Sequence, residues 1–356
     1  MDPTQEEGLV VTPGGPRRAD LVRAVNAGEA VRQGTGGLAA VVSQAEKGTA
    51  SAGASNAITD LVLTPGGYRS RSLVRQVGPN RALHAAGDRM LLMNLATDAL
   101  IDIPRPAPLP AAVPALGSGW IAYAYWNNGT GTPISAFETM WRVPLDPATR
   151  SGQTIFLFNG IQDCGANYGI LQPVLQWGIS GAGGGPWWSV ASWYVASGGQ
   201  AFHTPLVRVY PGDALVGVMR LTGQSGHGFD YLCEFRGLAG TAVPVQNIAE
   251  LLWCNETLQA YQISRCSDYP DATRTEFGAI LVSTGSASPA LNWTGVNRVT
   301  DCDQKAVVVS NSATAGVIDL HYRKQRRNRP HAPLGRNALT TASTVSSLGP
   351  PIRSMQ

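Results

Sequence analysis

Two glutamines on one face of a predicted strand are the residues whose type and spacing most suggest chemistry. They lie in GILQPVLQWG, residues 169–178. Because successive side chains of a strand point to opposite faces, Gln172 and Gln176 share a face with Val174. The opposite face of this strand is wholly apolar, which predicts that it faces the core. The amides could serve a side-chain ladder, a ligand or a reaction, because each offers both a donor and an acceptor.

Neighbouring predicted strands supply further polar and aromatic groups, notably in WWSVASWYV, residues 187–195. Aromatic rings stack on the apolar faces of sugar rings, while amides and hydroxyls bind sugar hydroxyls. If the strands pair as expected, these groups line one concave sheet and predict a site for a glycan or peptide. The predicted ligand-binding residues are Gln172, Gln176, Trp188, Ser192 and Tyr194.

The composition favours strands and turns over helices. Only 14% of the 356 residues are charged, and the chain has 41 Gly and 24 Pro. Short apolar or alternating runs follow one another from residue 119 to 312, separated by turn residues. This pattern predicts an all-β fold, an antiparallel two-sheet sandwich of jelly-roll type over 118–323. The chain shows neither alternating strands and helices nor a phosphate-binding glycine loop, which argues against a nucleotide-binding fold.

The N-terminal region, residues 1–103, contains an internal repeat. LVVTPGGPRRADLVRAV (9–25) and LVLTPGGYRSRSLVRQV (61–77) agree at 11 of 17 positions. Each copy predicts a short strand, a type II turn with a positive φ at the first Gly, and a basic segment. The copies are either a duplicated structural motif or arms that dock on another subunit of a homo-oligomer. The Pro/Ala-rich segment 104–117 predicts an extended linker before the sandwich.

The C-terminal segment 324–356 predicts a basic, flexible tail. The chain's net charge is +3, but no acidic residue follows Asp319. Such a tail is either simply solvated or makes non-specific contact with nucleic acid or another anionic surface. The predicted basic residues at its start are Arg323, Lys324, Arg326, Arg327 and Arg329.

The five cysteines do not predict a metal site, because none lies in a CxxC pair or near a suitably spaced His. In an oxidising compartment we expect bonds between Cys233 and Cys254 and between Cys266 and Cys302, which leaves Cys164 as a thiol. No cofactor is expected. No apolar run approaches the ~20 residues of a transmembrane helix. The start MDPTQEEG lacks a secretory signal, so we expect a cytoplasmic protein, or a secreted or surface-associated one if the chain is processed.

The order of several segments resembles a known family. GWIAYAYW, FETMWRVP, FLFNGIQD, ILQ, WWSVASWYV, VYPGDAL and LLWCNETL, within 119–285, resemble the eqolisins, fungal glutamic peptidases with a concanavalin A-like sandwich. The resemblance implies a Gln that polarises the peptide carbonyl and a Glu that acts as general base. Gln172 stands at the family's Gln position. Leu252 stands at the position of the Glu and cannot carry a proton.

Three functions follow from these residues. The favoured prediction is a non-catalytic, lectin-like carbohydrate-binding protein on an eqolisin-like scaffold. The first alternative is a divergent glutamic-peptidase-like hydrolase that uses Gln172 with Glu256, a displaced carboxylate four residues beyond Leu252. The second alternative is a self-assembling shell or filament subunit with terminal arms. A glycosidase is not predicted, because the chain lacks a strand with closely spaced carboxylates.

Overall fold

The structure is a computed structural model. It describes residues 61–322, apart from positions 88 and 227 and the segments 104–118, 164–168 and 197–198, together with the backbone of four short strands between residues 9 and 43. The contacts within the chain divide it into two units, Met1–Lys324 and Gln325–Gln356. The predicted linker and the predicted basic tail therefore lie outside the described residues, as does Cys164.

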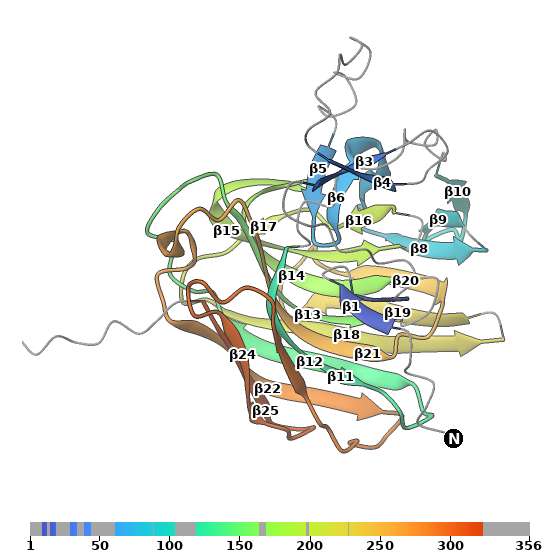
Figure 1. Cartoon of the computed structure of the whole chain (residues 1–356). Coiled ribbons are helices and arrows are strands. Elements are labelled where there is room, and N and C mark those ends of the chain that lie inside the picture. The colour runs from blue at the N-terminus through green and yellow to red at the C-terminus, as the bar shows by residue number, and fades with distance from the viewer. Residues whose placement is uncertain are drawn as a thin grey trace, which may run out of the picture. The chain divides into compact units, whose positions relative to one another are not determined.

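Two large sheets, packed face to face, form the body of the protein (Figure 1). The ten-stranded sheet has the order β10 (Leu100–Asp102), β9 (Arg89–Asn94), β8 (Arg81–Ala86), β20 (Val243–Ile248), β19 (Gly228–Phe235), β18 (Ala214–Ser225), β12 (Ile134–Arg142), β22 (Arg274–Thr284), β25 (Gly316–His321) and β24 (Lys305–Ser310). The nine-stranded sheet has the order β23 (Thr294–Asn297), β11 (Trp120–Asn127), β21 (Trp253–Tyr261), β13 (Thr154–Gln162), β14 (Ile170–Ser180), β15 (Gly183–Val195), β16 (Ala201–His203) and β7 (Val74–Gln76), with β17 (Val207–Arg208) also paired to β15. The predicted all-β, two-sheet sandwich is confirmed.

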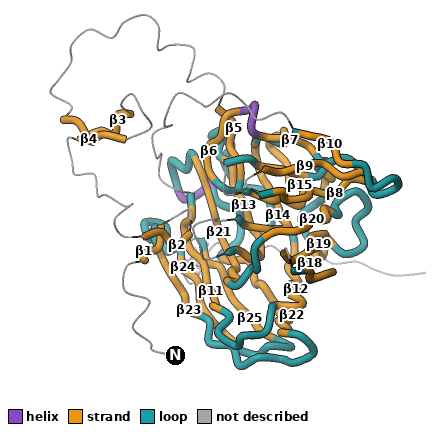
Figure 2. Tube along the Cα trace, turned by 90° about the vertical axis from the view of Figure 1, so that its right-hand side faces the viewer, coloured by secondary structure: helices purple, strands orange, loops and turns teal. Residues whose placement is uncertain are grey.

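Helix is confined to single turns in the described part of the chain, η3 (Arg71–Leu73) and η4 (Cys266–Asp268), drawn in purple in Figure 2. Neither turn approaches the length or hydropathy that a membrane-crossing helix needs, and no other described helix does so.

Both faces of the nine-stranded sheet are buried at its central strands, β21, β13 and β14. On the inner face, toward the ten-stranded sheet, Leu171, Leu175 and Trp177 of β14 join the main core, as their apolar periodicity predicts. On the outer face, Val174 belongs to a second apolar cluster with Phe158 of β13. Burial on both faces explains why β13 and β14 read as nearly continuous apolar runs.

The predicted boundary between an N-terminal region and the sandwich was wrong. Strand β7 pairs in parallel with β16 in the nine-stranded sheet, and β8 pairs in parallel with β20 in the ten-stranded sheet. Strands β9 and β10 then extend the ten-stranded sheet to its edge. The four strands β7 to β10 therefore belong to the sandwich itself. Sequence reading missed them because parallel pairing between distant segments leaves no local signal.

The two copies of the repeat form the same hairpin. In the first copy, β1 (Leu9–Thr12) pairs with β2 (Gly15–Arg18). In the second copy, β5 (Leu61–Thr64) pairs with β6 (Gly67–Ser70) in the same register. Between the copies, β3 (Glu29–Gln33) and β4 (Ala39–Ser43) form a separate hairpin. The expected type II turn was wrong in the second copy, because the positive φ of 93° falls on Gly67 rather than on Gly66. A Cβ at Gly66 would lie 2.7 Å from the side chain of Val195 on β15, so this hairpin packs against the nine-stranded sheet of the same chain.

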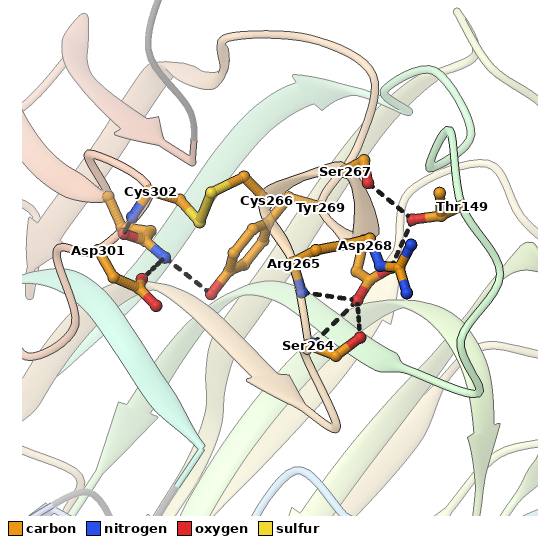
Figure 3. The surroundings of a disulfide bond; sticks show 10 residues. Thr149, Ser264, Arg265, Cys266, Ser267, Asp268, Tyr269, Asp301 and Cys302 are labelled. Atoms are coloured by element: carbon orange, nitrogen blue, oxygen red, sulfur yellow. Dashed lines mark hydrogen bonds between the residues drawn. A yellow bond between two sulfur atoms is a disulfide. The ribbon is translucent and has the colours of Figure 1, made fainter.

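One disulfide joins two connections between the sheets (Figure 3). Cys266 lies between β21 and β22, and Cys302 lies between β23 and β24, so each connection runs from the nine-stranded to the ten-stranded sheet. This is the bond expected from the sequence. The bond expected between Cys233 of β19 and Cys254 of β21 was wrong, because both cysteines are buried as thiols.

A buried carboxylate organises the loop beside the disulfide (Figure 3). Asp268 accepts hydrogen bonds from the hydroxyls of Thr149, Ser151 and Ser264 and from the backbone N–H groups of Ser264 and Arg265. Burial alone would raise the pKa of Asp268, but these bonds outweigh it and hold the pKa well below its ordinary value. The ionised carboxylate therefore stabilises the folded loop.

Candidate functional site

The outer face of the nine-stranded sheet carries a row of polar and aromatic side chains around Gln172. Directly opposed residues of neighbouring strands point to the same face. Gln172 of β14 opposes Trp193 of β15, and Trp193 opposes His203 of β16. In the other direction, Asn255 of β21 opposes Tyr125 of β11. We call this set, Tyr125, Asn255, Gln172, Trp193 and His203, the outer-face row.

Gln172 is the unusual member of the outer-face row. Its side chain is 0% exposed, and neither its amide oxygen nor its amide nitrogen has a hydrogen-bond partner. The indole N–H of Trp193, on the adjacent strand, is also buried without a partner. Leaving a buried polar group unsatisfied costs about 1–3 kcal/mol, so these two residues side by side are the candidates on this face for hydrogen bonds to another molecule.

Gln176, on the same face of the same strand, has the opposite character. Its amide nitrogen donates to the carbonyl oxygens of Gly178 (2.8 Å) and Gly183 (2.9 Å), and its oxygen accepts from the Ser180 hydroxyl (2.7 Å). These bonds hold the hairpin between β14 and β15. Its hydrogen bonds are thus made within the chain, and we exclude Gln176 from the ligand set predicted from the sequence.

Aromatic rings border the outer-face row at its β11 end. The ring of Tyr125 stacks on Trp253 with centroids 5.0 Å apart and an interplanar angle of 23°. The ring centroid of Trp253 also lies 6.1 Å from the ring centroids of Trp120 and Tyr123. Tyr125 is half-buried while the other three are buried, so Tyr125 offers an accessible edge of an otherwise packed aromatic cluster.

His203 is a member of the row that the sequence did not reveal. Its ring lies 4.8 Å from that of Trp193, and its Nδ1 lies 2.9 Å from the Thr204 carbonyl oxygen. Because a carbonyl only accepts, Nδ1 carries the proton. Burial lowers the pKa of His203, opposed in part by this bond, so the ring is neutral at pH 7. A short strand between two turns gave no signal for this position.

Four of the predicted site residues lie on the opposite, inner face of the sheet. Ser192 and Tyr194 flank Trp193 along β15 and point away from it, and Trp188 packs on Trp177 in the main core. Glu256 opposes Asn159, is 0% exposed and accepts a hydrogen bond from Thr139 of the ten-stranded sheet. The prediction that these four share a face with Gln172 was therefore wrong.

For the three residues of β15, the cause of this error is the hairpin between β14 and β15. Its register sets even-numbered residues of β14 opposite odd-numbered residues of β15, as the pair of Gln172 with Trp193 shows. A glycine-rich turn of different length would have reversed this relation. Tyr194 instead borders a separate cavity of about 220 Å³ at the end of the strands, near Asp163 and Asn247.

The predicted pairing of Gln172 with Glu256 is not made, because the two side chains lie on opposite faces of the sheet. Glu256 is also the only Asp or Glu within the strands of the nine-stranded sheet, so the outer faces of these strands carry no carboxylate. Leu252, at the position that the family resemblance assigns to the catalytic Glu, directly precedes β21. The described outer face can therefore form hydrogen bonds and ring contacts, but its strands supply no general base of the glutamic-peptidase kind.

Comparison with known proteins finds similarity at the level of solved structures. No protein-family model matches the sequence, and no curated protein matches it. Similar solved structures include scytalido-glutamic peptidase with a transition-state analogue inhibitor (15% identity, TM-score 0.39) and the same enzyme with a peptide-based analogue (14%, 0.38). A third is SCP-B, a member of the eqolisin family of peptidases, in complex with the tripeptide Ala-Ile-His (13%, 0.33). Each alignment covers 57% of this chain and 98% of the other.

Proposed function

We propose that this protein is a non-catalytic binding protein whose outer-face row holds a neutral, hydroxyl-rich ligand of the carbohydrate type. The observation that carries the proposal is the Gln172 amide, buried with neither of its polar atoms paired. A sugar hydroxyl both donates and accepts, so adjacent hydroxyls can bond to the oxygen and the nitrogen of one amide. The indole N–H of Trp193 supplies a further donor beside them.

The surroundings of Gln172 favour a neutral ligand. The described strands of the nine-stranded sheet place no carboxylate on this face, and burial keeps His203 uncharged. Transfer of an ionised ligand into such a buried, uncharged site would be costly, whereas hydroxyl groups lose little when they regain hydrogen bonds. The aromatic rings of Trp193 and Tyr125 supply faces against which the C–H groups of a sugar can pack.

The proposed ligand is enclosed. Because Gln172 and Trp193 are both 0% exposed, a ligand that reaches them is surrounded by protein, and the site must open to admit it. Binding that waits for such opening associates more slowly than binding to an exposed patch. Slow association is thus an expected property of this protein.

A glycan array followed by isothermal titration calorimetry tests the proposal. With a glycan that binds the wild type, Gln172→Ala should weaken the affinity at least tenfold, about 1.4 kcal/mol. Gln224→Ala is the matched control, because Gln224 is an exposed glutamine on β18 of the other sheet. Equal affinity of Gln172→Ala and the wild type would refute the site. Binding of peptides but of no glycan would refute the ligand class.

A further inference from the structure

A square of four residues joins the two sheets in the middle of the sandwich. Glu256 and Asn159 oppose each other on β21 and β13, and Thr139 and Gly217 oppose each other on β12 and β18 of the other sheet. The Thr139 hydroxyl donates to Glu256 Oε1 (2.5 Å), and the Asn159 amide nitrogen donates to the Gly217 carbonyl (3.2 Å). Two hydrogen bonds therefore cross between the sheets.

Two side-chain oxygen atoms of these four residues make no hydrogen bond. Glu256 Oε2 and Asn159 Oδ1 are both buried without a partner. If Glu256 were ionised, both would be acceptors only, and the charge would be buried without a counter-ion. A single proton on Glu256 Oε2 would turn it into a donor for the unpaired Oδ1 of the directly opposed Asn159.

We propose that Glu256 is kept as a neutral carboxylic acid whose proton is donated to Asn159 Oδ1, so that the sandwich is held together across this square in a pH-dependent way. Burial raises the pKa of Glu256, and the Thr139 hydrogen bond offsets this only in part. The proposal does not depend on the ligand site, because Glu256 lies on the other face of the sheet.

Among the described residues, the groups packed around Glu256 carry no charge that would stabilise its ionised form. Its neighbours are Ala124 of β11, Asn159 of β13, Thr139 of β12 and Gly217 of β18. The nearby titratable groups that face the core are the thiols of Cys254 and Cys233 and the phenol of Tyr231. The other buried carboxylates of the described residues lie elsewhere: Asp268 in its loop, Asp163 beyond the end of β13, and Asp319 beside Arg274.

The sign of the pH dependence follows from the direction of the pKa. A carboxyl whose pKa is higher in the folded than in the unfolded chain favours folding fully only below its unfolded pKa, ~4.3. As the pH rises above that value, the unfolded chain loses the proton and the folded chain keeps it. The unfolding constant then rises up to about tenfold per pH unit until the folded pKa is reached.

Thermal and urea unfolding of the wild type and Glu256→Gln from pH 4 to pH 9 tests this. The Gln amide accepts from Thr139 and donates to Asn159 at every pH, so the variant lacks the dependence. We expect its unfolding constant to fall below that of the wild type by a factor that grows with pH above about 4.3. Glu276→Gln, at an exposed position of β22, is the matched control and should follow the wild type. A ratio of the Glu256→Gln and wild-type constants that stays unchanged with pH would overturn the proposal.

Infrared spectroscopy gives a second reading that does not require the variant to fold. The folded wild type at pH 7 should show the carbonyl band of a protonated carboxyl group that does not exchange quickly with solvent. The same band should disappear when the protein is unfolded at pH 7. A wild-type spectrum at pH 7 without a protonated carboxyl would overturn the proposal, whatever the behaviour of Glu256→Gln.

Discussion

The two glutamines of β14 should respond in opposite ways to the same substitution. Methionine has nearly the length and volume of glutamine but cannot form its hydrogen bonds. In Gln172→Met, an amide with both polar atoms unpaired is replaced by an apolar chain. Because an unsatisfied buried polar group costs about 1–3 kcal/mol, we expect the ligand-free protein to become more stable by about that amount.

Gln176→Met removes three hydrogen bonds that hold the β14–β15 hairpin. At about 1 kcal/mol each, with the Ser180 hydroxyl left to find another acceptor, we expect a loss of about 2–4 kcal/mol. The two variants sit on the same strand and face, four residues apart, so each is the control for the other.

Urea denaturation of the ligand-free proteins, followed by tryptophan fluorescence, measures both changes in the free energy of unfolding. For a body of this size, each 1 kcal/mol corresponds to a shift in Tm of about 2–4 °C. A loss of stability in Gln172→Met equal to that in Gln176→Met would refute the reasoning, because it would mean that the Gln172 amide already has partners in the ligand-free protein.

Further predictions concern the sheets and the loops that join them. Gly217→Ala should destabilise the protein by about 1–3 kcal/mol or more, because the added Cβ would lie 2.3 Å from Asn159 Oδ1. Gly129→Ala is the control: its Cβ would enter open space, so its free energy of unfolding in the same urea titration should be near that of the wild type. Asp268→Ala removes a buried carboxylate that accepts from two backbone N–H groups and three hydroxyls, so we expect a loss of about 2–4 kcal/mol at pH 7. Because the pKa of Asp268 is lowered by folding, that loss should shrink as the pH falls below about 4, and a loss that grows in acid would contradict the assigned role. Reduction of the Cys266–Cys302 bond should cost about 3–4 kcal/mol, measured as a shift in the thermal midpoint with and without reductant, and an unchanged midpoint would contradict it. If the repeated segments instead mediate self-assembly, light scattering should give a mass well above 37.5 kDa that falls when residues 1–60 are removed, and an unchanged mass would exclude that role.

The strands of the sandwich could be predicted from the sequence because burial and period-two alternation are local properties. The predicted strand 170–178 is β14, extended by two residues, and the apolar face of GILQPVLQWG does face the core. Strands β7 and β8 could not be predicted in the same way, because their partners β16 and β20 lie far along the chain.

The candidate site was predicted only in part, because its composition depends on register rather than on residue type. Gln172 was singled out from the sequence, and the structure gives it Trp193 rather than Trp188 as the aromatic neighbour on its face. The alternation of side chains on β15 was visible in the sequence. The pairing that decides which alternate residues of β15 share a face with Gln172 was not. The inward direction of Glu256 was hidden for the same reason, since a single strand does not reveal which of its faces meets the other sheet.

The most direct test of the proposed function is a crystal structure of the protein grown with a glycan that the array identifies. We predict density for the sugar on the outer face of the nine-stranded sheet, with hydroxyl groups within hydrogen-bond distance of both amide atoms of Gln172 and of the Trp193 indole nitrogen. A glycan bound elsewhere, with ordered water or the chain's own groups bonded to the Gln172 amide, would contradict the account.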